Sequence, residues 1–221
     1  MAEKESKFPT HKNHLNKTYL EELNYKFWST KSIRFRSSTR LLTQNNLSNK
    51  AIGFLSAYLI ILGLLSVYKI TGESMISDNL IAFGTTTISI LLLAFSQMEA
   101  AQDFKIRARN FQECALKVSA LYDELRIFKT LQNSSEDDTH EFCKMISKKY
   151  QAVLEGYPNH ESIDYKKFRV EQRDYFELGP WICFKTNLRY YAQVKLVYHA
   201  MILIPAIIII ASILNSLEKG L

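Results

Sequence analysis

The 221-residue chain is poor in the residues that make turns and in those that usually carry chemistry. It has only seven glycines and four prolines, a composition that favours long helices over turn-rich folds. Its three cysteines, Cys114, Cys143 and Cys183, are odd in number and show no C-x-x-C spacing. This argues against disulfides and against a zinc site. The five histidines are scattered along the chain and predict no metal site either.

Nucleotide-binding and catalytic motifs are also missing. The sequence contains no P-loop and no G-x-G-x-x-G, H-E-x-x-H or G-x-S-x-G pattern. Residues 158–165 bring together a histidine, an aspartate and a tyrosine, but they follow Gly156 and are typical of a turn before a helix capped at Ser162. We therefore expect no catalytic residues, no cofactor and no enzyme activity.

Two uncharged apolar segments dominate the first half of the chain. Residues 51–68 and 79–98 hold eighteen and twenty residues without a charge. As helices these segments would be roughly 27 and 30 Å long, about the thickness of a bilayer's hydrocarbon core. Only residues 69–78 separate them. We predict a two-helix transmembrane hairpin over residues 51–98, with helices at 51–70 and 79–98.

A third apolar run covers residues 196–217, with His199 as its one residue that titrates near neutral pH before Glu218. Pro205 lies near its middle, which a membrane helix tolerates when neighbours satisfy the freed carbonyl. We predict a third transmembrane helix here. A re-entrant helix and a helix on the membrane surface are the alternatives.

Charge predicts the orientation. Residues 1–50 carry ten Lys or Arg against four acids, whereas residues 99–195 carry sixteen against fifteen. Because Lys and Arg mark the cytoplasmic side, the N-terminus and residues 99–195 should be cytoplasmic in a multi-pass inner-membrane protein. No apolar region of a signal peptide occurs at the start. Orientation and attraction to anionic headgroups account for the basic excess, so we expect no nucleic-acid binding.

The cytoplasmic part has the periodicity of helices. Residues 1–50 form a basic, amphipathic N-terminal region, and no Gly or Pro interrupts residues 85–155, so the second span should continue as one helix to about residue 131. Further helices are expected at about 135–156 and 181–195. An apolar seam with 4-3 spacing predicts either association between subunits or packing within one chain. Its members are Phe104, Ala108, Phe111, Ala115, Val118, Tyr122 and Leu125.

Small and hydroxyl side chains share faces of the first two spans. On the second span these are Thr85, Ser89 and Ser96, and on the first they are Gly53, Ser56 and Gly63. Close packing of the two spans is one interpretation. A hydroxyl-lined conduction path in an oligomer is the other. No charge lies inside either span, so a proton relay or voltage sensor has no candidate residue.

Together these features predict an all-α membrane protein: a transmembrane helical hairpin, a cytoplasmic helical bundle or coiled coil, and a third C-terminal transmembrane helix. The chain resembles the SLATT family, which consists of small two-span membrane effectors associated with bacterial nucleotide-second-messenger synthetases and SLOG sensors. The segments that carry the resemblance are KSIRFR at 31–36, RL at 40–41, FLSAYLI at 54–60, QMEAA at 97–101 and FKIRA at 104–108.

The resemblance implies a membrane effector of a prokaryotic conflict or antiphage system. After a signal from a sensor or nucleotide synthetase encoded nearby, such a protein oligomerises and forms a pore in the inner membrane or otherwise permeabilises it, which kills or arrests the cell. The third apolar run goes beyond the two-span pattern of the family. The alternative is a membrane-anchored scaffold whose cytoplasmic helices recruit a partner. Both hypotheses expect the lipid bilayer as a partner.

Overall fold

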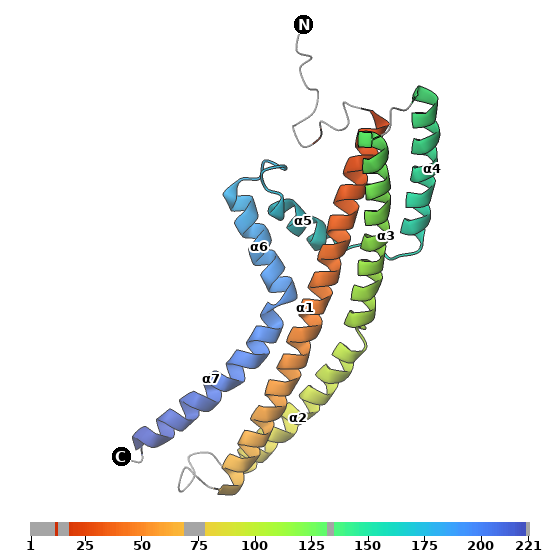
Figure 1. The fold of residues 1–221 in the computed structure, drawn as a ribbon. Coiled ribbons are helices and arrows are strands. Elements are labelled where there is room, and N and C mark those ends of the chain that lie inside the picture. Colours follow the sequence, from red (N-terminus) through yellow and green to blue (C-terminus); the bar gives the residue numbers. More distant parts are fainter. Residues whose placement is uncertain (1–11, 13–17, 69–77, 132–134, 220–221) are drawn as a thin grey trace. The chain divides into compact units, whose positions relative to one another are not determined.

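The computed structural model describes residues 12, 18–68, 78–131 and 135–219, and the predicted hairpin loop and N-terminal tail lie almost wholly outside them. The described residues are helical and contain no strand (Figure 1). The helices are α1 (Tyr19–Tyr68), α2 (Asp78–Ala100), α3 (Phe104–Leu131), α4 (Glu136–Glu155), α5 (Ser162–Glu171), α6 (Pro180–Val194) and α7 (Leu196–Lys219).

The chain divides into two compact units. Unit 1 contains residues up to Leu42 and Lys105–Tyr190, and unit 2 contains Thr43–Phe104 and Tyr191–Leu221. Helix α1 belongs to both, because its 50 residues run without a break through the boundary. The amphipathic N-terminal region and the first apolar segment, which the sequence suggested as separate regions, are thus one helix. No proline occurs in α1, and its first glycine is Gly53.

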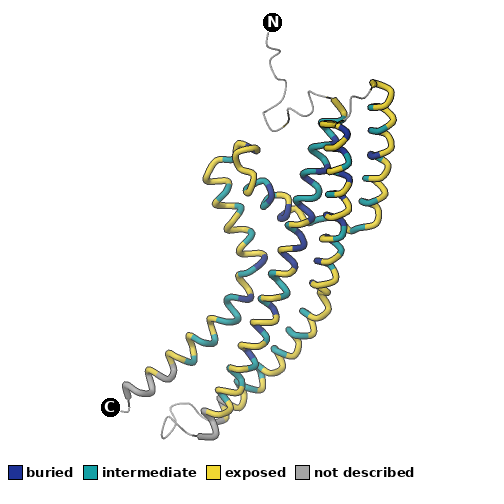
Figure 2. Tube along the Cα trace, viewed as in Figure 1, coloured by how far each residue is buried: buried dark blue, intermediate teal, exposed yellow. Residues whose placement is uncertain are grey.

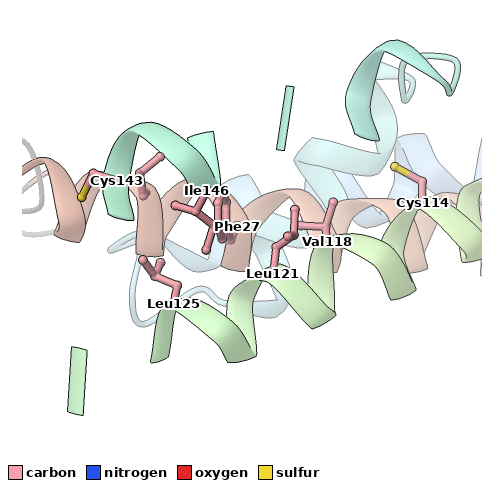
Figure 3. Close-up of a cluster of buried hydrophobic side chains, with 8 residues drawn as sticks. Phe27, Cys114, Val118, Leu121, Leu125, Cys143 and Ile146 are labelled. Carbon is pink, nitrogen blue, oxygen red and sulfur yellow. The ribbon is translucent and has the colours of Figure 1, made fainter. Parts of the chain in front are cut away.

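Unit 1 is built around an apolar core between α1, α3 and α4. Leu23 and Phe27 of α1 meet Val118 and Leu125 of α3 and Ile146 of α4, each at most 1% exposed. Figure 3 shows most of these side chains pointing toward one another from the three helices. Burial of each such side chain stabilises the fold by about 1.5–3 kcal/mol. The first part of α1 and helix α4 therefore each turn an apolar face toward this core.

Helix α4 begins where its sequence predicts. Ser135 is the N-cap: its hydroxyl accepts from the backbone N–H of Asp138 at 3.1 Å, and the Asp138 carboxylate accepts from the backbone N–H of Ser135 at 3.2 Å. This reciprocal capping box satisfies two amides that the first turn would leave unpaired. Bonding to Ser135 lowers the pKa of Asp138 below its usual range.

The expectation of one continuous helix from the second apolar segment to residue 131 is wrong. Helix α2 ends at Ala100, and α3 begins at Phe104. Between them Asp103 adopts a left-handed backbone conformation, with φ at 50°, and its N–H bonds the carbonyl of Ala100. A left-handed residue ends a helix, and Asp is among the few non-glycine residues that tolerate it.

A similar stop separates α5 from α6. Glu177 has φ at 51°, and the Leu178 N–H reaches back to the Arg173 carbonyl at 3.0 Å. This six-to-one bond is part of the Schellman pattern that closes helix ends. Near it, a second apolar cluster joins Ile33 of α1 to Phe168 and Phe176. These contacts attach the segment after α4 to the first part of α1.

Unit 2 contains the later part of α1, helix α2 and helix α7. Among the described residues, the part of α1 from Tyr19 to Leu64 is long and apolar enough to cross a membrane. Helices α6 and α7 pass the same test only as a pair, and their axes bend by 65° at the break. The third apolar run is thus helical, as Leu196–Lys219, and its crossing of a membrane stays a prediction. Much of the chain in unit 2 is exposed along these helices (Figure 2).

Candidate functional site

The strongest polar feature of the described residues is a buried ion-pair cluster of Ser37, Arg40, Glu161 and Asp164 in unit 1. Arg40 donates from Nε to Asp164 Oδ1 at 2.8 Å and from Nη2 to Asp164 Oδ2 at 3.1 Å. Its Nη2 also lies 2.9 Å from Glu161 Oε1. The Ser37 hydroxyl lies 2.9 Å from Asp164 Oδ2. The two side chains at the centre are almost wholly buried, at 4% exposure for Arg40 and 0% for Asp164.

Helical spacing positions both sides of this cluster. Ser37 and Arg40 are three residues apart on α1, so both point to one face. Glu161 and Asp164 have the same spacing across the start of α5, where Glu161 is the N-cap residue. Carboxylates near a helix N-terminus are stabilised by the unpaired amides there. The start of α5 therefore offers two acids at the spacing that Ser37 and Arg40 match.

The charges of the cluster are mutually stabilised. Burial alone would lower the pKa of Arg40, but the hydrogen bond and the charge of Asp164, joined by Glu161, outweigh it and raise that pKa. A bidentate guanidinium–carboxylate pair is the geometry that best offsets the cost of burying two charges. Arg107 Nη2 of α3 stands 3.7 Å from Glu161 Oε1, which connects the pair to a third helix.

Arg34 makes a second buried contact with the same segment. It is 2% exposed and donates to the Pro158 carbonyl and, at 3.3 Å, to Asn159 Oδ1. Its guanidinium carbon lies 5.5 Å from the centre of the Phe111 ring. Burial first, and then the charge of Arg34, lower the pKa of the adjacent His160. The turn at 158–161 is therefore held to α1 by two arginines.

These contacts correct the interpretation of the basic residues ahead of the first apolar segment as headgroup-binding. Arg34 and Arg40 are buried, Arg36 pairs with Glu171, and Lys31 Nζ lies 3.8 Å from the centre of the Tyr122 ring. Lys50, the last cation before that segment, is exposed. Most of the basic residues just ahead of the first apolar segment therefore make their contacts within unit 1.

The sequence carries one signal for this cluster, a hydroxyl and a cation at i, i+3 in one helix and two acids at i, i+3 at the start of another. The turn expected at 158–165 is shorter than predicted, because α5 starts at Ser162 with Glu161 rather than Ser162 as its N-cap. The side chains of the cluster satisfy one another, so it can act as a clamp that fixes one helix register.

The predicted association seam belongs to unit 1 except for Phe104, which belongs to unit 2. Phe104, Ala108, Phe111, Ala115, Val118 and Leu125 are each at most 8% exposed, and Tyr122 packs against the core. Packing within one chain accounts for this seam, since the side chains are covered by the chain's own helices. Association between copies stays a prediction. Because the seam is already covered, such association would have to use a different surface of the chain.

The hydroxyls of α2 bond to their own helix. Thr85 donates to Ala82 O at 3.0 Å, Ser89 to Thr85 O at 2.7 Å and Ser96 to Leu93 O at 2.9 Å. Ser89 is exposed, and Thr85 and Ser96 are half-buried. These bonds leave the hydroxyl oxygens able to accept from another group.

The small residues of α1 show no close helix approach within the described part of the chain. A Cβ placed on Gly53 or Gly63 would meet nothing within 4 Å. Ser56 donates to Ile52 O at 2.9 Å, again within its own helix.

Two tyrosines make polar contacts between helices of unit 2. Tyr58 of α1 donates to the Ile202 carbonyl of α7 at 2.9 Å. That carbonyl lies three residues before Pro205, in the turn where the proline removes a helical hydrogen bond. Tyr198 of α7 donates to Glu99 of α2 at 3.0 Å. Each contact satisfies a polar group in otherwise apolar surroundings.

The family assignment agrees with this architecture. A protein-family model described as SMODS and SLOG-associating 2TM effector domain family 5 matches residues 16–211. No curated protein and no solved structure gave a match. Because the family model covers residues 16–211, the chain belongs to this SLATT family, which confirms the resemblance drawn from its sequence segments.

Proposed function

We propose that the chain is a membrane effector of a prokaryotic conflict system, which oligomerises and permeabilises the inner membrane after a signal from a partner. The observation that carries the proposal is the match of residues 16–211 to a two-transmembrane effector family associated with SMODS and SLOG proteins. The apolar, uncharged stretch at the end of α1 and the apolar composition of α2 support a location in the membrane. In this proposal the chain itself is not an enzyme.

Helix α1 supplies the physical link from signal to membrane. Its first part packs in the core of unit 1, through Leu23 and Phe27, and its last part is the first apolar segment. Helix α1 has no proline and no glycine before Gly53, so it lacks the residues that usually kink a helix. In this proposal, rotation or translation of its first part is therefore passed on to its last part. A partner that shifts unit 1 would thus move the first span directly. The connection between α2 and α3 is interrupted at Asp103, so it is less suited than α1 to transmit such a movement.

The orientation is part of the proposal. The N-terminus and residues 99–195 would be cytoplasmic, and residues 69–78 would face the other side. A cysteine introduced as Ser74→Cys should react with a membrane-impermeant maleimide in intact cells. Cys114 and Cys143 are buried in unit 1 and should not react. Labelling of Ser74→Cys only after lysis would contradict this orientation.

The central experiment is membrane depolarisation in cells that express the full chain with its neighbouring sensor. The triple variant Thr85→Leu, Ser89→Leu and Ser96→Leu should reduce dye entry at least several-fold if these hydroxyls line a path. Each of these hydroxyls donates to a carbonyl of α2 itself, so the variants remove hydrogen bonds within that helix. Thr86→Leu is the matched control, since Thr86 bonds Ala82 O in the same way on a different face.

A membrane-anchored scaffold is the alternative from another class. It predicts that both variants keep full activity, because the spans would serve only as anchors. Intact potential and growth in the wild type, with the chain inserted and the sensor activated, would refute the effector proposal itself.

A further inference from the structure

Helix α6 has one face that is covered by other parts of the chain. Cys183, Thr186, Tyr190 and Val194 follow a 3-4-4 spacing and are buried or half-buried. Lys167 of α5 donates to Asn187 at 2.7 Å, and its Nζ lies 5.4 Å from the centre of the Tyr190 ring. This face fixes α6 in place.

The opposite face of α6 is apolar and exposed. Trp181, Phe184, Leu188 and Tyr191 follow a 3-4-3 spacing, which places them on the side of the helix away from the packed face. They are 73%, 58%, 56% and 39% exposed. Trp181 and Phe184 stack with ring centres 5.8 Å apart. We name these four residues the α6 stripe.

The charge beside the α6 stripe has one sign. Lys185 and Arg189 lie at its edge, Lys195 follows the helix, and residues 180–194 contain no acid. A symmetric contact between two copies through this face would bring like charges together. An anionic bilayer surface instead offers phosphates to the cations and a shallow apolar layer to the aromatic rings.

We propose that α6 lies on the surface of an anionic lipid bilayer, with the α6 stripe inserted at the level of the headgroups and the upper acyl chains. The apolar α7 begins at Leu196, and the axes of α6 and α7 differ by 65°. With α7 tilted by about 20° as an average span, α6 would lie up to about 85° from the bilayer normal. Three cations on and just after α6 are costly in the hydrocarbon core, which disfavours α6 as half of a bent span.

This inference rests on the proposed membrane location, and the experiment separates the two. The full chain is reconstituted in vesicles of phosphatidylethanolamine and phosphatidylglycerol, and carbonate extraction first tests insertion. The emission of Trp181 is obtained as the difference between the wild type and Trp181→Phe, since Trp28 is the other tryptophan. Lipids brominated near the headgroup and lipids brominated near the chain end serve as depth probes.

We expect blue-shifted Trp181 emission, at least twofold stronger quenching by the shallow bromines than by the deep ones, and protection from acrylamide. Leu188→Glu should abolish the shallow quenching. Leu116→Glu is the matched control, because Leu116 on α3 is 55% exposed against 56% for Leu188. In Lys185→Gln/Arg189→Gln, the shallow quenching should no longer depend on phosphatidylglycerol.

Carbonate-resistant protein with Trp181 fully open to acrylamide would overturn this inference and leave the membrane location intact. Protection from acrylamide without bromine quenching, increasing with protein concentration, would mean that a second copy covers the stripe and would also overturn it. Protein released by carbonate would contradict both the inference and the proposed function.

Discussion

Replacement of Asp164 by asparagine tests the buried ion-pair cluster. The change keeps the shape of the side chain and removes its charge, so Arg40 stays buried at 4% exposure without its main counter-ion. Loss of one partner of a buried pair costs about 3–5 kcal/mol. Glu161 still accepts from Arg40 at 2.9 Å, which places the expected loss of stability near the lower limit, at about 3 kcal/mol.

The assay is thermal unfolding of the detergent-solubilised chain, followed by the fluorescence of Trp28. The Trp28 ring lies 5.2 Å from that of Phe168, so its emission reports on the contact between α1 and α5. Trp181→Phe provides a background without the second tryptophan. For a protein of this size about 3 kcal/mol corresponds to a decrease in Tm of about 6–12 °C.

Arg109→Gln is the matched control. Its pair with Glu113 has the same guanidinium–carboxylate chemistry at 2.8 Å, but the side chains are 79% and 43% exposed. Such a pair contributes about 0.3–0.5 kcal/mol, so Tm should change by no more than about 2 °C. The double variant Arg40→Met/Asp164→Leu should be more stable than either single variant. Equal decreases for Asp164→Asn and Arg109→Gln would refute the reasoning from burial.

Two further predictions concern pH and the proline turn. Burial and Arg34 lower the pKa of His160, so the unfolded chain takes up a proton near pH about 6.5 that the folded chain binds only at lower pH. The contribution of neutral His160 to the free energy of unfolding should therefore be fully present above this pH and decrease as the pH falls through it. In denaturant titrations, His160→Gln should weaken this dependence of the free energy of unfolding on pH. Tyr58→Phe removes the bond to the Ile202 carbonyl and should cost about 1 kcal/mol. Thermal unfolding measures this loss, and an unchanged Tm would contradict the contribution of this hydrogen bond.

Periodicity predicted which residues are buried better than it predicted what covers them. The 4-3 spacing identified Ala108, Val118 and Leu125, all at most 1% exposed. The same spacing fits a seam between copies and a seam between helices of one chain, because both bury one stripe. The cap at Ser135 was predictable, since it depends only on a hydroxyl and an acid three residues later.

The end of α2 was not predictable from the usual helix breakers. The sequence around Asp103 contains neither glycine nor proline, and a left-handed aspartate leaves little trace in composition. The pairing of Arg40 with Asp164 was hidden for a different reason. The two residues are 124 positions apart, and helix periodicity carries no information on contacts at that distance.

The arginines ahead of the first apolar segment bear on two separate questions, the insertion of the chain and the binding of lipid headgroups. The positive-inside rule concerns the insertion of the chain, when these residues are not yet packed. Attraction to headgroups concerns the folded protein, and there Arg34 and Arg40 are buried in unit 1. Their burial therefore leaves the predicted orientation unchanged and removes them from the lipid-binding charge. Cations that bind headgroups must be exposed, and Lys185 and Arg189 beside the α6 stripe meet that condition.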